Sequence, residues 1–271
     1  MHATELCLAL VTLAPLARAQ AVEVTAHHRA YDLWASGYDY EFDDGIWVQR
    51  ETHELLAPWN RDEEVVLDDY YGVEVSRASA THDSAWTSEG LTVSMHSRAR
   101  SDHAPYFQTD AGSVQRLEVD FDVRRRVRYR LLLDVETDPD EYSVVTAWMN
   151  GPEGSHFGMQ VWGGDTEVHE ESGWLRVGSY ALELQLDAGI LLTHGESAIC
   201  DTFTELDLSL FQAADFDLDG DVDALDRLRF RQAFTASSAG ADVDGDGDTD
   251  ARDWRIYLHL WLSATTRQIG F

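Results

Sequence analysis

The sequence has 271 residues, of which 50 are Asp or Glu and 20 are Lys or Arg, so its formal net charge at pH 7 is -30. A chain this acidic repels nucleic acid and anionic lipid, and we therefore expect no nucleic-acid partner. The length allows one sandwich-sized domain together with a smaller module.

The N-terminal segment predicts secretion. Leu6 to Ala21 is a short apolar stretch that ends in small residues of A-x-A type. We predict a signal peptide over residues 1–20 and a secreted or cell-surface mature protein; an N-terminal core helix is the alternative. The stretch is shorter than the roughly 20 apolar residues of a membrane span, and Pro15 interrupts it, so no transmembrane segment is expected. Loss of Cys7 with the signal peptide would leave Cys200 as the single cysteine.

Residues 21–212 predict a mainly β domain. Apolar and polar side chains alternate in at least seven short segments, and turn signals separate these segments. Half-buried strands without intervening helical periodicity favour an antiparallel β-sandwich of jelly-roll type. The positions expected to face inward are Val73, Val75, Leu91, Val93, Met95, Leu117, Val119, Phe121, Val123, Val127, Tyr129, Leu131, Leu133, Val135, Phe157, Met159, Val161, Tyr180, Leu182, Leu184, Leu186, Leu206, Leu208 and Leu210.

Two neighbouring alternating runs predict a hairpin centred on Arg124. Acidic residues occupy the outward positions of the first run, and arginines occupy those of the second, so all of them would face solvent as cross-strand pairs. A site for an anionic glycan or phosphate is the alternative role of the arginines. The expected pairs are Asp122 with Arg126, Asp120 with Arg128, and Glu118 with Arg130.

The segment from Tyr31 to Trp59 is less regular and rich in aromatic side chains. Exposed aromatic rings bind carbohydrate by stacking on sugar rings, whereas buried aromatic rings fill a core. The pattern leaves both roles open, so a glycan is a possible partner of this domain. The aromatic residues are Tyr31, Trp34, Tyr38, Tyr40, Phe42, Trp47 and Trp59.

No catalytic residue is predicted. His53-Glu54 and His169-Glu170 begin like a zinc-protease motif, but Ala57 and Gly173 stand where the second histidine belongs. The sequence contains no GxSxG motif, no phosphate-binding glycine loop and no CxxC. We therefore favour a non-catalytic protein; a glycoside hydrolase is the alternative, because paired carboxylates can be recognised only in space.

Two acidic loops of one pattern follow the β domain. DFDLDGDVDALD occupies 215–226 and DVDGDGDTDARD occupies 242–253, each with Asp at loop positions one, three, five, seven, nine and twelve. This is the ligand arrangement of an EF-hand calcium loop, because alternate side chains of a tightly coiled loop can point at one cation. Gly220 and Gly247 stand at position six, where the chain must turn sharply. A pair of solvated Asp/Gly-rich turns is the alternative.

The spacing assigns ligands for two Ca²⁺ sites. Positions one, three, five and twelve supply carboxylates, position seven supplies its backbone carbonyl, and position nine acts through water. Position twelve is Asp in both loops, where the usual EF-hand has Glu. The expected ligands are Asp215, Asp217, Asp219, Asp221 and Asp226 in loop one, with Asp223 through water, and Asp242, Asp244, Asp246, Asp248 and Asp253 in loop two, with Asp250 through water.

A helical pattern follows each loop, while Leu206 to Leu210 before loop one alternates like a strand. After loop one Phe230 and Phe234 are four residues apart, as Tyr257 and Trp261 are after loop two. Residues 213–271 thus contain two copies of a loop followed by one helix, an arrangement that resembles the dockerin type I module of secreted bacterial proteins. Thrombospondin type 3 repeats share the DxDxDG core but lack these helices.

The resemblance implies calcium-dependent folding and docking onto a cohesin module. Dockerins select their cohesin through loop positions ten and eleven, which are Ala224 and Leu225, then Ala251 and Arg252, in place of the Ser/Thr pairs of cellulosome dockerins. The sequence thus predicts a secreted or cell-surface, non-catalytic protein with a calcium-binding module that serves attachment or assembly. A carbohydrate-binding protein, or a component of a polysaccharide-degrading enzyme, is the alternative.

Overall fold

The computed structural model describes residues 21–38, 43–52, 58–68, 74–87, 89–102, 108–138, 142–193 and 197–268. The predicted signal peptide, Tyr40, Phe42, Val73 and the His53-Glu54 pair lie outside these ranges. Within them, no helix is both long enough and apolar enough to cross a membrane.

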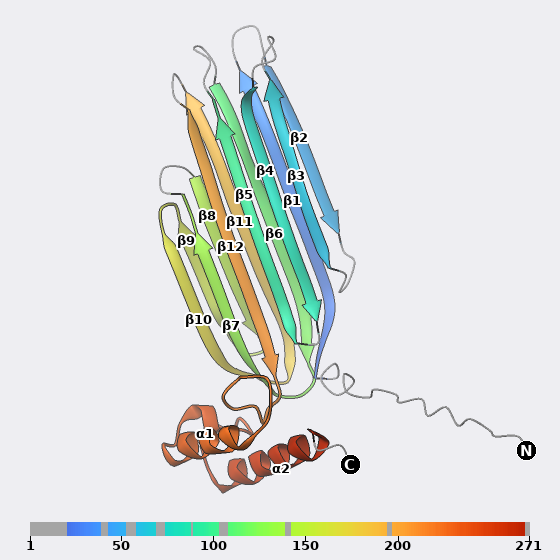
Figure 1. The fold of residues 1–271 in the computed structure, drawn as a ribbon, viewed down its shortest axis with the longest axis vertical. Helices are drawn as coiled ribbons and strands as arrows, with labels where there is room; N and C mark the ends of the chain where they lie inside the picture. Colours follow the sequence, from blue (N-terminus) through green and yellow to red (C-terminus); the bar gives the residue numbers. More distant parts are fainter. Residues whose placement is uncertain are drawn as a thin grey trace, which may run out of the picture.

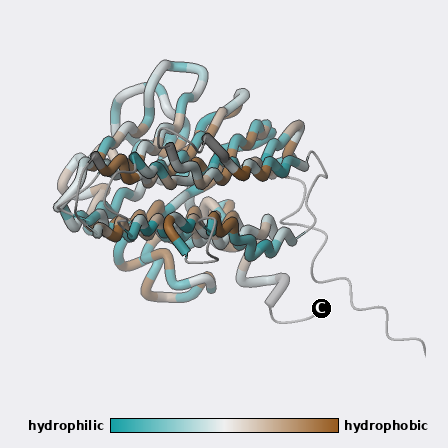
Figure 2. Tube along the Cα trace, turned by 90° about the horizontal axis from the view of Figure 1, so that it is seen from above, coloured by the Kyte–Doolittle hydropathy of each residue, from teal (hydrophilic) through white to brown (hydrophobic). Residues whose placement is uncertain are grey.

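The described chain forms two antiparallel sheets that pack face to face, and Figure 2 shows the two layers from one end. The first sheet has the order β2-β1-β6-β11-β8-β9 and the second has the order β10-β7-β12-β5-β4-β3 (Figure 1). The predicted mainly β sandwich is confirmed. The strands are β1 (Val22–Tyr38), β2 (Asp43–Thr52), β3 (Trp59–Asp68), β4 (Glu74–Thr87), β5 (Gly90–Ser101), β6 (Gln108–Val123), β7 (Val127–Glu136), β8 (Tyr142–Gly151), β9 (Gly154–Trp162), β10 (Thr166–Leu175), β11 (Gly178–Thr193) and β12 (Ala198–Phe211).

The core between the sheets consists of the side chains that the alternation places inward. Every predicted inward position among the described residues is at most 9% exposed. Most of them form one continuous cluster, which includes Phe121 stacked on Tyr180 with ring centroids 5.3 Å apart. A second cluster, which includes Tyr31 and Leu33, fills another part of the sandwich. Cys200 on β12 is buried there as well.

The predicted hairpin at Arg124 is wrong. β6 belongs to the first sheet and β7 to the second, so the chain crosses between the layers at 124–126. The position opposite Asp122 is taken by Glu23 on one side and Ser179 on the other. Alternation shows which side chains face the core, and both a hairpin and a crossing between layers satisfy that condition equally.

The aromatic segment is more regular than its pattern suggests, because it forms β1, β2 and the start of β3. His27 and Arg29 occupy inward positions of β1, so polar residues interrupt the apolar alternation that would reveal the strand. Tyr31 and Trp59 are 1% and 7% exposed, whereas Trp47 is 70% exposed. Core packing therefore accounts for some of these rings and not for others.

Two helices follow the sandwich, as predicted, and no helix precedes loop one within the described chain. Loop one leads into α1 (Ala224–Thr235), a short 3-10 helix spans Ala239–Ala241, and loop two leads into α2 (Ala251–Gln268). Figure 1 shows both helices beyond the end of the sandwich at which β12 ends.

Candidate metal centre

The carboxylate at position twelve organises loop one. Asp226 Oδ1 accepts hydrogen bonds from the backbone N–H groups of Phe216 and Asp217, the latter at 3.1 Å. Its Oδ2 accepts from the N–H of Asp223 at 2.7 Å. Asp223 in turn caps α1 by accepting from the N–H of Leu225 at 2.6 Å. Asp226 therefore joins the start of the loop to the first turn of the helix.

Loop two repeats these contacts position by position. Asp253 Oδ1 accepts from the N–H groups of Val243 at 2.6 Å and Asp244 at 3.1 Å. Its Oδ2 accepts from the N–H of Asp250 at 2.9 Å, and Asp250 accepts from the N–H of Arg252 at 2.6 Å. The two loops thus share one internal hydrogen-bond pattern.

Position one meets the glycine at position six in both loops. Asp215 Oδ2 accepts from the N–H of Gly220 at 3.0 Å, and Asp242 Oδ2 accepts from the N–H of Gly247 at 3.1 Å. Both glycines have φ of 96°, and nothing lies within 4 Å of a Cβ placed on either. The backbone conformation, and not a steric clash, therefore explains glycine at this position.

Carboxylate oxygens gather inside each loop. Those of Asp215, Asp217 and Asp226 lie within 4.8 Å of one another, and so do those of Asp242, Asp244 and Asp246. Further groups combine position twelve with positions seven and nine: Asp221, Asp223 and Asp226, and then Asp248, Asp250 and Asp253. Of the predicted carboxylate ligands at positions one, three, five and twelve of loop one, the structure leaves Asp219 exposed and outside these groups.

Asp215 is the most unusual of these carboxylates. It is 0% exposed, and its Oδ1 has no hydrogen-bond partner among the described residues. Burial, followed by the nearby charge of Asp226, raises the pKa of Asp215 to about 7. A buried, unpartnered carboxylate oxygen beside like charges is costly, and a divalent cation would supply the missing partner.

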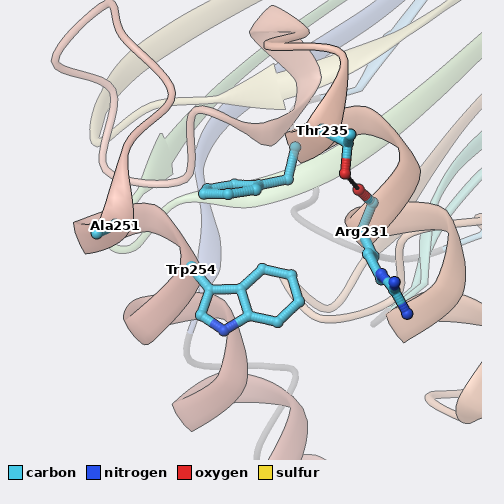
Figure 3. Close-up of a pocket in the computed structure, with 5 residues that line it drawn as sticks. Arg231, Thr235, Ala251 and Trp254 are labelled. Atoms are coloured by element: carbon cyan, nitrogen blue, oxygen red, sulfur yellow. Dashed lines mark hydrogen bonds between the residues drawn. The ribbon is translucent and has the colours of Figure 1, made fainter.

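The helices after the loops pack through equivalent aromatic residues. Phe230 stacks on Tyr257 with ring centroids 3.8 Å apart, and Phe216 of loop one meets Phe230 edge-on at 5.3 Å. Figure 3 shows a pocket on this module, with Arg231 and Thr235 of α1 and Trp254 of α2 among the residues that line it. The pocket is lined by Arg231, Phe234, Thr235, Ala251 and Trp254.

Two arginines, Arg126 directly before β7 and Arg128 within it, join the loops to the sandwich, which corrects the expectation that the arginines all face solvent. Arg128 is 8% exposed, with its guanidinium 4.2 Å from the ring centroid of Phe216 and 5.1 Å from that of Trp174. Arg126 lies 4.6 Å from the Trp174 ring, and its Nη1 is 3.8 Å from Asp242 Oδ1. Only Arg130 of the three is exposed as predicted.

Trp174 of β10 completes this contact, and its Nε1 donates to the Gly240 carbonyl at 3.2 Å. We call Arg126, Arg128 and Trp174 the module junction. Sequence reasoning did not identify it. The arginines at the alternate positions 126, 128 and 130 indicated it, but the surface that covers Arg126 and Arg128 comes from a distant part of the chain.

No protein-family model and no curated protein matches the chain. Among solved structures, the carbohydrate-binding module TmCBM61 in complex with β-1,4-galactotriose aligns at 8% identity over 54% of this chain and 86% of that one, with a TM-score of 0.23. A study of promiscuous carbohydrate-binding modules of the β-sandwich superfamily provides another match, at 7% identity over 66% and 84% of the two chains, with a TM-score of 0.14. These similarities concern the β-sandwich architecture alone.

Proposed function

We propose that residues 213–271 form a calcium-binding module with two sites, and that the chain is a secreted or cell-surface, non-catalytic protein whose β-sandwich carries this module. One observation supports this most strongly. Both loops make the same internal hydrogen bonds around acidic positions one and twelve, and the buried Asp215 carboxylate in loop one has an oxygen without a partner.

Calcium fits the donor set better than a softer metal. Every candidate ligand is a carboxylate or a backbone carbonyl, and Ca²⁺ takes six to eight such oxygens in a flexible shell. Burial and mutual repulsion disfavour the ionised form of these carboxylates, and a bound ion would neutralise their charge. The chain's own residues already hold the loop backbone in place, since Asp226 and Asp253 each accept three backbone hydrogen bonds.

The resemblance to dockerin type I supports a role in attachment or assembly, with a cohesin-like module as a candidate partner. Leu225 and Leu228 on α1 are 42% and 48% exposed, so this helix offers apolar side chains to a partner.

Titration calorimetry with Ca²⁺ on the full chain tests the calcium sites. We expect two Ca²⁺ ions per chain for the parent and one for either Asp226→Asn or Asp253→Asn, because each variant removes the negative charge and one of the two oxygens of a position-twelve carboxylate. Glu167→Gln, an exposed position on β10, is the matched control and should keep both sites. Absence of binding heat, or a stoichiometry unchanged in both loop variants, would contradict the proposal.

The sandwich supports a second candidate function, carbohydrate binding. The observation that favours it is a pair of stacked tryptophans on the first sheet, the half-buried Trp34 and the exposed Trp47, with ring centroids 5.7 Å apart and an interplanar angle of 20°. The test is whether native gels that contain a polysaccharide retard the full chain. Unchanged mobility in every polysaccharide would reject this function.

A further inference from the structure

One row of residues crosses the first sheet from its β2 edge. Trp47 on β2 pairs with Trp34 on β1, Trp34 pairs with Gly112 on β6, Gly112 pairs with Gly189 on β11, and Gly189 pairs with Tyr142 on β8. Paired residues of neighbouring strands point to the same face of a sheet, and this row lies on the face away from the core. We call these five residues the aromatic row.

The two glycines let Trp34 lie on the sheet. A Cβ at Gly112 would be 2.3 Å from Trp34 Cζ2, and one at Gly189 would be 3.9 Å from the same atom. Any larger residue at 112 would therefore displace the indole. At the two ends of the row, Trp47 is 70% exposed and Tyr142 is 60% exposed, so large aromatic surfaces face water without being used by the core.

Polar groups with fixed geometry lie beside this row. Trp34 donates a hydrogen bond to the Asp110 carboxylate. On β11, Gln185 Nε2 donates to Asp187 Oδ1 at 3.0 Å, while Gln185 Oε1 accepts from Arg116 Nη2 at 2.9 Å. Asp187 is two residues from Gly189, about 7 Å along the strand. A ring stacked on the row would therefore have the Asp187 carboxylate within reach of its substituents.

The charges of this face select against an anionic ligand. Asp32, Asp110 and Asp187 point outward around the row, and the nearby cation Arg116 is already bound to Gln185. Sugar hydroxyls can donate to such carboxylates, whereas a uronate or sulfate group would be repelled.

We propose that the aromatic row and the adjoining Asp187 and Gln185 form a binding site for an uncharged polysaccharide. This inference rests on the proposed carbohydrate-binding function and assigns it a place and a ligand class. The pyranose rings stack on Trp34 and Trp47, and hydroxyl groups donate to Asp187, whose carboxylate Gln185 holds in place. An extended chain lies across the strands toward Tyr142.

Native gels that contain mixed-linkage β-glucan, xylan, galactan, galactomannan or the anionic polygalacturonate test the site with the full chain. We expect at least one neutral polymer to retard the parent and polygalacturonate to leave it unaffected. Trp47→Ala and Gly112→Leu should each weaken retardation at least tenfold, measured as the polymer concentration for half-maximal effect. Unchanged melting temperatures of the variants establish that they are folded. If Gly112→Leu does not fold, Trp47→Ala alone tests the site, because it changes an exposed position of an edge strand.

Trp148→Ala is the matched control. Trp148 lies on the same face, its ring also covers a glycine, Gly158, and it is 42% exposed, but it is about 20 Å along β8 from Tyr142. The Trp148→Ala variant should be retarded by the same polysaccharides, and to the same extent, as the parent. Retardation that is lost in Trp148→Ala and kept in Trp47→Ala would overturn this site while leaving carbohydrate binding intact. Preferential retardation by polygalacturonate would overturn the ligand class, and no retardation by any polymer would reject the function itself.

Discussion

The buried side chain of His82 makes the stability of this protein depend on pH. His82 on β4 is 0% exposed, and neither ring nitrogen has a hydrogen-bond partner among the described residues. Its ring lies 4.6 Å from that of Trp59. Burial, followed by the positive charge of Arg29, lowers the pKa of His82 to about 3. The folded protein therefore keeps this histidine neutral through the range in which an unfolded chain protonates it.

The folded state should consequently lose stability as the pH falls. Below the unfolded pKa of about 6.5 the unfolded state binds a proton that the folded state does not, so the free energy of unfolding decreases by about 1.4 kcal/mol per pH unit from this residue until the pH approaches the folded pKa. His82→Phe should remove this contribution, so that the stability difference between parent and variant changes with that slope between about pH 6 and pH 4.

Urea unfolding at several pH values measures that difference. His259→Phe, at an exposed position on α2, is the matched control and should follow the parent. A constant difference between the parent and His82→Phe across this pH range would show that His82 is protonated in the folded state.

At the scale of elements, β7 connects the sandwich to both loops. Its inward residues fill the core, while Arg128 on its other face and Arg126 directly before the strand contact the C-terminal module. Burial lowers the pKa of Arg128 to about 10, although the charges of Asp215 and Asp226 oppose this shift. The arginine thus places a positive charge beside the proposed ligands of loop one.

Replacement of Arg128 should strengthen calcium binding at loop one. A cation bound by Asp215 and Asp226 is repelled by the guanidinium in a partly desolvated site, so Arg128→Leu is expected to tighten binding about tenfold, or about 1.4 kcal/mol. Calorimetry in an Asp253→Asn background isolates loop one, and the exposed Arg130→Leu serves as control. Weaker binding in Arg128→Leu would show instead that the arginine mainly holds the loop in its binding conformation.

The elements differ in how far the sequence predicts them. Period-two alternation correctly predicted the inward faces of β5, β6, β7, β11 and β12, because each places apolar side chains in one core. It did not reveal β1, whose inward His27 and Arg29 are polar, or the partners of β6, because pairing depends on contacts between distant segments. The hydrogen bonds within the two loops are local and follow the spacing of the aspartates, whereas the calcium ligands stay a prediction. The module junction and the aromatic row needed the three-dimensional register.

For the molecule as a whole, the sandwich and the C-terminal module differ in what stabilises them. The sandwich has a large apolar core between two sheets. The module has a small one, built on four fully or nearly buried residues, namely Phe230, Ala241, Val243 and Tyr257. A core of that size supplies little stability alone, so the module should depend on bound calcium and on its contact with β7 and β10.

Hydrogen–deuterium exchange with calcium and with chelator tests this central claim most directly, because it reports on each element separately. Calcium bound only to the folded module must stabilise it by mass action. We predict that the backbone amides of α1 and α2 exchange much faster in chelator, while those of the central strands β5, β6, β11 and β12 keep their protection. Equal protection of α1 and α2 in both conditions would contradict the account.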